Sequence, residues 1–231
     1  MKHDIVYFVK QQPFNEELRY SVRSVEKNFP YNKIWFYGGC PLGLKPDEHI
    51  FVKQDQPTKW ENVRKMLYEV CNNNDITENF WLFNDDFFIM KKIDEPKNYY
   101  NGSLENRIKE IENRRKGHKS EYSVNLEITK QLLEEQGYPT LNYAVHIPML
   151  INRKKALETL NKFPDSPMFR SLYGNYVKLP AVDMPDVKIH QPSVNPKDDA
   201  IMLSSSDRSF EIGYIGVVIK VKFRNKSKYE N

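Results

Sequence analysis

Short, largely apolar runs alternate with amphipathic segments along the first 90 residues of the chain. Residues 4–9, 33–37 and 80–83 are runs of strand length, and residues 49–52 form a shorter one. Between them, residues 16–28 and 59–71 place apolar side chains at helical spacing, and Asn15 is expected to cap the first of these helices. Buried strands separated by amphipathic helices are typical of a mainly parallel sheet with flanking helices, so the sequence predicts an α/β fold.

The pattern is less regular beyond residue 90. Residues 91–121 are polar and charged and a helix is expected over residues 124–135, so we predict a polar helical insertion at about residues 94–136. Further helices are expected over residues 154–163 and 168–176. Residues 204–207 can cap a helix, residues 215–221 fit either strand or helix, and residues 222–231 are predicted to form a basic surface tail. No repeat or linker divides residues 1–231, which indicates a single domain.

Composition narrows the class of protein. The chain has 231 residues, of which 39% are hydrophobic, enough for one sizeable core. No apolar run approaches the roughly 20 residues of a membrane helix, and the N-terminus lacks a signal-peptide core, so a cytoplasmic location is expected. The two cysteines, Cys40 and Cys71, are expected to be reduced. The net charge of +4 is compatible with an anionic substrate, and the absence of glycine-rich phosphate loops argues against kinases and dinucleotide enzymes.

Two adjacent carboxylates, Asp85 and Asp86, interrupt the apolar run FWLFNDDFFIM at residues 80–90. Ionised carboxylates inside a core cost several kcal/mol unless a positive group meets them. We therefore expect the strand to end near Asn84, with the pair at the edge where open α/β sheets place their ligands. Two such carboxylates, with water and substrate phosphates, are typical ligands of Mg²⁺ or Mn²⁺. An ordinary turn is the alternative, because Asn-Asp-Asp also favours turns.

Other charged residues have two interpretations. Arg19 and Arg23 flank the apolar face of the first helix and can lean toward a phosphate, although a solvated flank is the alternative for at least one of them. The basic residues between positions 107 and 119 are predicted to lie on a solvated, mobile insertion rather than in an anion-binding patch. His146 stands alone in the apolar residues 141–150, where a histidine is more often a core residue than a catalyst.

Several separated stretches together resemble a known family. These are residues 15–30 (NEELRYSVRSVEKNFP), residues 80–89 with their NDDFF centre, the His-Ile-Pro at residues 146–148, and the closing FRNKSKYE at residues 223–230. In order and spacing they resemble the regions of the Stealth family of sugar-phosphate transferases, and the end of the chain looks like that of short bacterial and phage glycosyltransferases. The resemblance covers roughly a third of the chain.

This resemblance implies a nucleotide-sugar-dependent transferase with a GT-A-like fold. Asp85 and Asp86 would then bind Mg²⁺ or Mn²⁺ and the donor diphosphate. Catalytic roles would belong to His146, Asp86 and Arg170, the last of which matches a late arginine of the family loosely. The predicted substrate-binding residues are Arg19, Arg23, Lys59, Asn62 and Asn84.

The sequence does not determine whether a sugar or a sugar phosphate is transferred, or to which acceptor. Sugar transfer releases a nucleoside diphosphate, whereas Stealth-type sugar-phosphate transfer releases a nucleoside monophosphate. We expect sugar transfer, because the chain lacks the family's Trp-Val signature after its first strand and ends differently. The acceptor is expected to be a glycan or a hydroxylated base of phage DNA. A non-catalytic protein that binds sugar nucleotide or nucleic acid is the remaining alternative.

Overall fold

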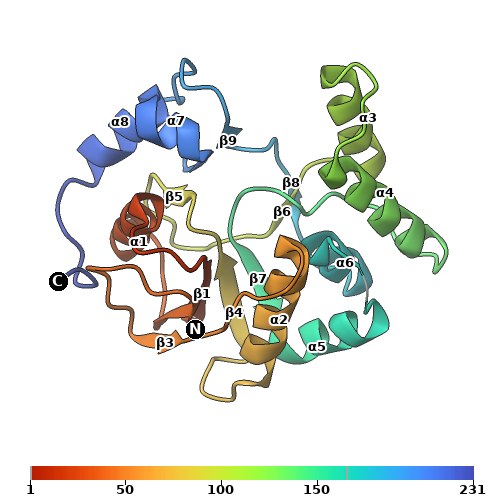
Figure 1. Ribbon diagram of the computed structural model, residues 1–231, viewed down its shortest axis with the longest axis horizontal. Coiled ribbons are helices and arrows are strands. Elements are labelled where there is room, and N and C mark those ends of the chain that lie inside the picture. Colours follow the sequence, from red (N-terminus) through yellow and green to blue (C-terminus); the bar gives the residue numbers. More distant parts are fainter. Residues whose placement is uncertain (1, 165) are drawn as a thin grey trace.

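The computed structural model describes residues 2–164 and 166–231 and is built on a five-stranded sheet of order β3-β2-β1-β4-β7 (Figure 1). Strands β1 (Asp4–Val9), β2 (Ile34–Gly38), β3 (Glu48–Ile50) and β4 (Asn79–Phe83) are parallel to one another. Strand β7 (Met149–Asn152) pairs antiparallel with β4. The prediction of a mainly parallel sheet with flanking helices is therefore confirmed.

Helices cover both faces of this sheet, because neighbouring residues of each buried strand point to opposite sides. Tyr7 faces helix α1 (Glu16–Asn28), whose Leu18, Val22 and Val25 belong to the same apolar cluster. Val6 faces the other layer, which contains α2 (Lys59–Asn72), α5 (Arg153–Lys162) and α6 (Phe169–Tyr176). Helix α1 begins as the sequence predicts, because the side chain of Asn15 caps the backbone N–H of Leu18 at 2.9 Å.

A smaller sheet of order β5-β10-β9 lies beside the C-terminal end of β4. It consists of β5 (Phe87–Ile89), β9 (Lys188–Ile189) and β10 (Met202–Ser205). Two helices follow β10, namely α7 (Asp207–Ile212), which Ser206 caps, and α8 (Tyr214–Lys222). Residues 215–221, which the sequence left undecided, are helical because Ile215, Ile219 and Phe223 pack on one side against Phe88 of β5.

The predicted insertion contains two antiparallel helices, α3 (Leu104–Arg114) and α4 (Glu121–Glu134), which project from the sheet (Figure 1). A two-stranded pairing of β6 (Tyr99–Tyr100) with β8 (Val182–Asp183) lies next to them. The prediction of a solvated basic segment is wrong for its first part. Leu104, Ile108 and Ile111 of α3 are buried, and the side chain of Arg107 is only 13% exposed.

The prediction of a surface tail is wrong for the end of the chain. Tyr229 is buried, and its hydroxyl donates a hydrogen bond to Asp47 Oδ2 at 2.9 Å and lies 3.2 Å from the hydroxyl of Tyr31. The side chain of Glu230 is fully buried against Arg23, with N–O distances of 2.6 Å. The consecutive residues Tyr229 and Glu230 hold the end of this segment, whereas the lysines that precede them in the segment face solvent.

Two further expectations from composition can be compared with the described residues. Cys40 is exposed and Cys71 is buried, and both are free thiols. Within residues 2–164 and 166–231, no helix has both the length and the apolar character that crossing a membrane requires.

Candidate functional site

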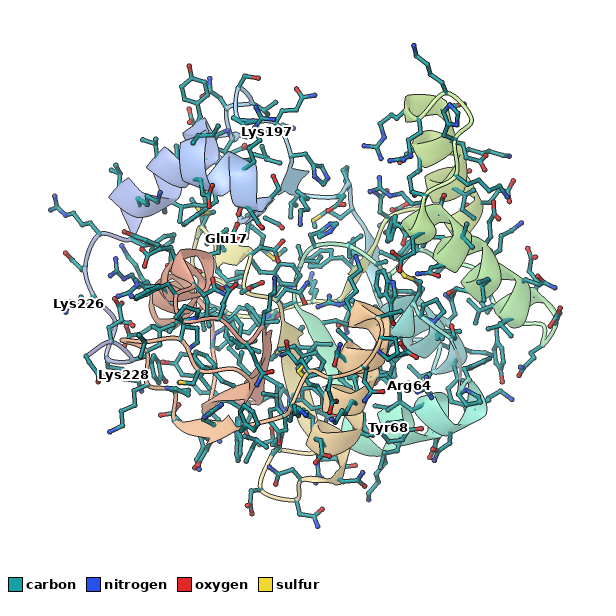
Figure 2. All side chains as sticks on the ribbon, viewed as in Figure 1. Glu17, Arg64, Tyr68, Lys197, Lys226 and Lys228 are labelled. Carbon is teal, nitrogen blue, oxygen red and sulfur yellow. The ribbon has the colours of Figure 1, made fainter. Side chains whose placement is uncertain are left out.

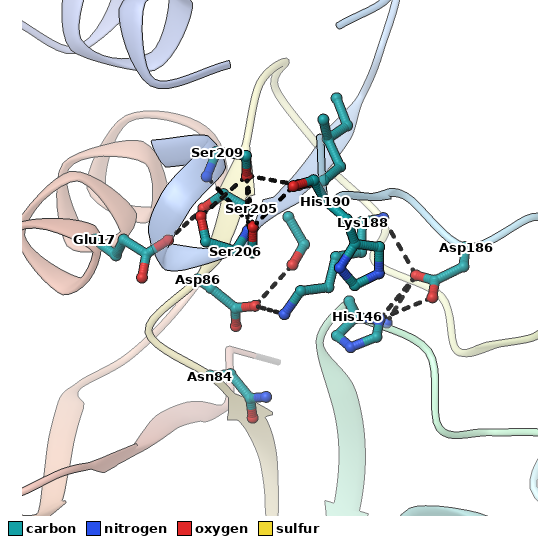
Figure 3. A network of polar contacts seen from close by, with 12 residues as sticks. Glu17, Asn84, Asp86, His146, Asp186, Lys188, His190, Ser205, Ser206 and Ser209 are labelled. Atoms are coloured by element: carbon teal, nitrogen blue, oxygen red, sulfur yellow. Dashed lines mark hydrogen bonds and ion pairs between the residues drawn. The ribbon is translucent and has the colours of Figure 1, made fainter. Parts of the chain in front are cut away.

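The acidic pair lies at the carboxyl end of β4, in the turn that leads to β5. Strand β4 ends at Phe83, so Asp85 and Asp86 lie in the turn that follows the strand. Asn15, at the start of α1, donates to Asp85 Oδ2 at 2.7 Å. Asp86 is only 8% exposed and accepts from Lys188 Nζ at 2.8 Å and Ser204 Oγ at 2.9 Å (Figure 3). The structure therefore places the pair where the sequence analysis expected it.

Negative charge accumulates around this turn. Burial, together with the neighbouring charge of Asp86, raises the pKa of Asp85 to about 6, although the hydrogen bond from Asn15 opposes the shift. Glu17 of α1 accepts from Ser205 Oγ at 2.5 Å. Burial and the charges of Asp85 and Asp86 raise the pKa of Glu17 to about 7. Burial is the larger cause of both shifts, and the neighbouring carboxylates add to it.

Arg170 of α6 reaches the end of β4 from the other side. Its guanidinium donates to the carbonyl oxygens of Ile147 at 2.6 Å and Leu82 at 3.3 Å, and lies 3.5 Å from Asn84 Oδ1. Burial lowers the pKa of Arg170 to about 10, while the charge of Asp86 opposes this shift. Arg170 therefore ties the acidic turn to the segment that carries His146.

His146 is not enclosed in the core, because its side chain is 24% exposed and hydrogen-bonded to Asp186. The distances from His146 Nδ1 to the two carboxylate oxygens of Asp186 are 2.8 and 3.0 Å (Figure 3). Burial favours protonation of Asp186, but the hydrogen bond from His146 and the charge of Arg107 outweigh it and lower the pKa of Asp186 to about 2. An ionised carboxylate only accepts hydrogen bonds, so Nδ1 carries a proton, and in the neutral form of the ring Nε2 has a free lone pair.

A second histidine lies close to this dyad. The rings of His146 and His190 are nearly perpendicular, with centroids 6.5 Å apart. Burial, with smaller effects from Lys188 and His146, lowers the pKa of His190 below its ordinary value. Arg107 of α3 lies 3.8 Å from Asp186, so the projecting helices also contribute a charged group here.

The structure thus brings together Asn84, Asp85, Asp86, His146 and Arg170 among the residues predicted for the site. The two arginines of α1 are engaged elsewhere, because both bond to Glu230. The Arg19 contact measures 3.2 Å and the shortest Arg23 contact 2.6 Å. Substrate binding by these two residues stays a prediction that the observed contacts do not favour.

The remaining predicted substrate residues lie at the start of α2. Lys59 Nζ lies 4.4 Å from the centre of the Trp60 ring. Asn62 hydrogen-bonds to the backbone carbonyl oxygens of Gln56 and Thr58, so it stabilises the entry into the helix. Their assignment to the substrate is also left as a prediction.

Sequence reasoning missed Glu17 and three residues of a single short segment. Asp186, Lys188 and His190 alternate with Val187 and Ile189, a period-two pattern that places their side chains on one face of an extended strand. That pattern is a usable signal in the sequence. This pattern does not indicate, however, that Lys188 contacts Asp86, which is 102 positions earlier in the chain.

The predicted divalent metal can be tested against this donor set. Across the described ranges 2–164 and 166–231, no three His, Cys, Asp or Glu side chains are gathered in a group that could hold an ion. Mg²⁺ and Mn²⁺ are often held by one or two carboxylates, with substrate phosphates and water as the other ligands. The oxygen chemistry of the pair fits such an ion, while Oδ2 of Asp85 already accepts from Asn15 and Oδ2 of Asp86 from Lys188 and Ser204.

Comparisons with known proteins concern the fold. No protein-family model matches the chain, and no curated protein matches it. The chain is similar to a galactosyltransferase, LgtC, solved in complex with donor and acceptor sugar analogs, with a TM-score of 0.51 and 11% identity over 97% of this chain and 96% of that one. It is more distantly similar to mouse xyloside xylosyltransferase 1, with a TM-score of 0.38 and 8% identity over 100% of this chain and 96% of that one.

Only the first of these likenesses is strong enough to support an argument, and it shows a GT-A-like fold. This confirms the fold predicted from the sequence. The resemblance to the Stealth family, by contrast, stays a prediction.

Proposed function

We propose that this protein is a glycosyltransferase that moves a sugar from a nucleotide-sugar donor to a hydroxyl group of a glycan. The observation that carries the proposal is the acidic pair at the carboxyl end of β4 in a GT-A-like fold, with Lys188 between Asp86 and the His146–Asp186 dyad. Ligands of open α/β sheets bind at this edge of the strands.

The donor's diphosphate is assigned to the acidic turn. Asp85 and Asp86 would hold Mg²⁺ or Mn²⁺, and the ion would neutralise the charge of the leaving diphosphate. Lys188 and Ser204 fix the Asp86 carboxylate, and both hydrogen bonds go to Oδ2. Arg170 lies behind the turn, where its positive charge limits the repulsion between Asp86 and its neighbours.

The acceptor hydroxyl is assigned to His146. A hydroxyl oxygen that attacks the anomeric carbon must lose its proton, and the lone pair on Nε2 of His146 can take it. Asp186 holds the ring by Nδ1 and stabilises the imidazolium that forms, so it acts as a positioning residue. Its own ionisation is secure at neutral pH, because its pKa is lowered to about 2.

A donor screen tests the proposal. Purified protein is incubated with individual nucleotide sugars and Mn²⁺ or Mg²⁺, and the released nucleotide is identified by chromatography. We expect release of a nucleoside diphosphate, and loss of that release in Asp86→Asn. The matched control is Asp75→Asn, which changes an exposed aspartate in the turn after α2.

The same screen separates the alternatives. Release of a nucleoside monophosphate would instead establish sugar-phosphate transfer of the Stealth type. Binding of a nucleotide sugar with no nucleotide released in the presence of candidate glycan acceptors would support a non-catalytic binding protein. Transfer of the sugar to hydroxylated DNA in preference to glycans would correct the acceptor class.

A further inference from the structure

Helix α8 is apolar on the side that faces solvent as well as on the side that faces the protein. Ile215 and Ile219 are fully buried, and Gly216 packs so closely on α7 that an added Cβ would lie 1.8 Å from the carbonyl oxygen of Phe210. This close approach fixes which face points outward. A helix with apolar residues all round is normally covered on all sides.

The outward face consists of exposed apolar side chains at positions i, i+3, i+4 and i+7. Val217 is 60% exposed and Val221 is 69% exposed, and Ile212 at the end of α7 is also 69% exposed. We call this surface the α8 stripe; its members are Ile212, Tyr214, Val217, Val218 and Val221. Contiguous exposed apolar side chains of this kind mark an interaction surface.

Positive charge borders the stripe. Residues 214–228 contain no acidic side chain and five basic ones, namely Lys220, Lys222, Arg224, Lys226 and Lys228. We call these five residues the basic border. Figure 2 shows Lys226 and Lys228 on the extended segment that follows α8, on the same side of the molecule as the helix in Figure 1. Lys222 and Lys226, with Lys27 of α1, also line a shallow cavity of about 180 Å³ whose one acidic lining residue is Glu26.

We propose that the α8 stripe and its basic border dock the protein onto an anionic lipid surface. An apolar helix face with flanking lysines matches the acyl boundary and the negative headgroups of such a surface at once. With only nine residues, α8 lies on the surface and does not span it. The proposal does not depend on the transferase activity.

Two other occupants fit less well. Nucleic acid would match the lysines through its phosphates but would leave the valines of the stripe without a partner. A second copy of the chain related by a twofold axis would match the apolar stripe but would bring two basic borders together, and like charges oppose such an interface.

Vesicle flotation tests the proposal with the full chain. Wild-type protein is mixed with phosphatidylcholine vesicles, with or without about one-third phosphatidylserine. We expect binding to the anionic vesicles only, and weaker binding at high salt. Val217→Ser with Val221→Ser should weaken binding at least tenfold. Lys222→Gln with Lys226→Gln should weaken it about 25-fold, because each basic residue near the surface contributes about fivefold.

Matched controls are available on other helices. Val124→Ser with Ile128→Ser changes two exposed apolar residues of α4, and Lys154→Gln with Lys155→Gln changes two exposed lysines of α5. Both controls should bind vesicles like the wild type. Thermal melts confirm that all variants are folded.

Three outcomes would overturn the proposal. The first is the absence of wild-type binding to anionic vesicles. The second is that Val217→Ser with Val221→Ser still binds the vesicles and that added DNA displaces the protein from them. This result would assign the basic border to nucleic acid. The third is a wild-type dimer in sedimentation equilibrium that the serine variant abolishes and vesicles do not dissociate.

Discussion

Removing one negative charge from the acidic turn should make the metal-free protein more stable. The pKa of Asp85 is raised from 3.8 to about 6, chiefly by burial and by Asp86. A raised pKa means that the protonated form is favoured in the folded state, so the stabilisation is present below about pH 4 and is lost as the pH rises through about 6. About two pH units correspond to ~3 kcal/mol at most.

The substitution Asp85→Asn gives the neutral form permanently and leaves an oxygen to accept from Asn15. Because Asp85 is partly exposed, solvent reduces the effect, and we expect a gain of ~1–3 kcal/mol at pH 7.5. For a chain of this size the melting temperature should rise by roughly 2–4 °C per kcal/mol. At pH 4 and below the variant and the wild type should be nearly equal.

The assay is thermal unfolding between pH 4 and 8, with and without Mn²⁺ and a nucleotide sugar. Ligand should stabilise the wild type but not Asp85→Asn, because the variant has lost a carboxylate of the proposed ion site. Asp75→Asn serves as the exposed control and should change the stability little. A variant less stable than the wild type at pH 7.5, or one still stabilised by metal and donor, would refute the reasoning.

Three other predictions address neighbouring contacts. Asp86→Ala should lower the free energy of unfolding by about 3–5 kcal/mol in urea titrations, because Lys188 keeps a buried charge without its partner. Glu230→Gln should lower the free energy of unfolding by about 3 kcal/mol, because the buried charge of Arg23 loses its partner. In the wild type, the pKa of Glu230 is lowered to about 2, so the stability should fall as the pH drops from about 4.5 toward 2. If Glu230→Gln leaves the stability unchanged, the pair with Glu230 does not hold Arg23 in a structural role, and Arg23 is again a candidate for substrate binding. His146→Gln should lower kcat about 10²-fold or more with donor KM nearly unchanged, and a purely structural histidine would instead lower the melting temperature.

Most of the fold could be predicted because it follows from local patterns. The apolar runs, the helical spacing of Leu18, Val22 and Val25, and the cap at Asn15 each depend on a few consecutive residues. The predictions failed where contacts between residues far apart in the sequence determine the structure. From their composition, residues 222–231 are expected to form a solvated basic tail. In the structure Glu230 pairs with Arg23, which is 207 positions earlier in the chain.

The candidate site divides in the same way. The acidic pair was predictable, because adjacent carboxylates inside an apolar run require a strand end. Lys188 and Asp186 were not, since their roles arise only when β9 joins β10 beside the acidic turn. Arg107 was assigned to a solvated segment because its neighbours in sequence are charged, whereas the apolar positions of α3 turn it inward to Asp186.

The charge balance of the site gives the strongest physical argument for a metal ion. Asp85, Asp86 and Glu17 are gathered at one end of β4, and the pKa values of Asp85 and Glu17 are raised to about 6 and about 7. Lys188 pairs with Asp86, and Arg170, which donates to backbone carbonyl oxygens, also interacts with the charge of Asp86. A donor diphosphate would add further negative charge beside these carboxylates. Under the proposed function we therefore expect donor binding to depend on an added cation, and two hard oxygen ligands favour Mg²⁺ or Mn²⁺ for that role.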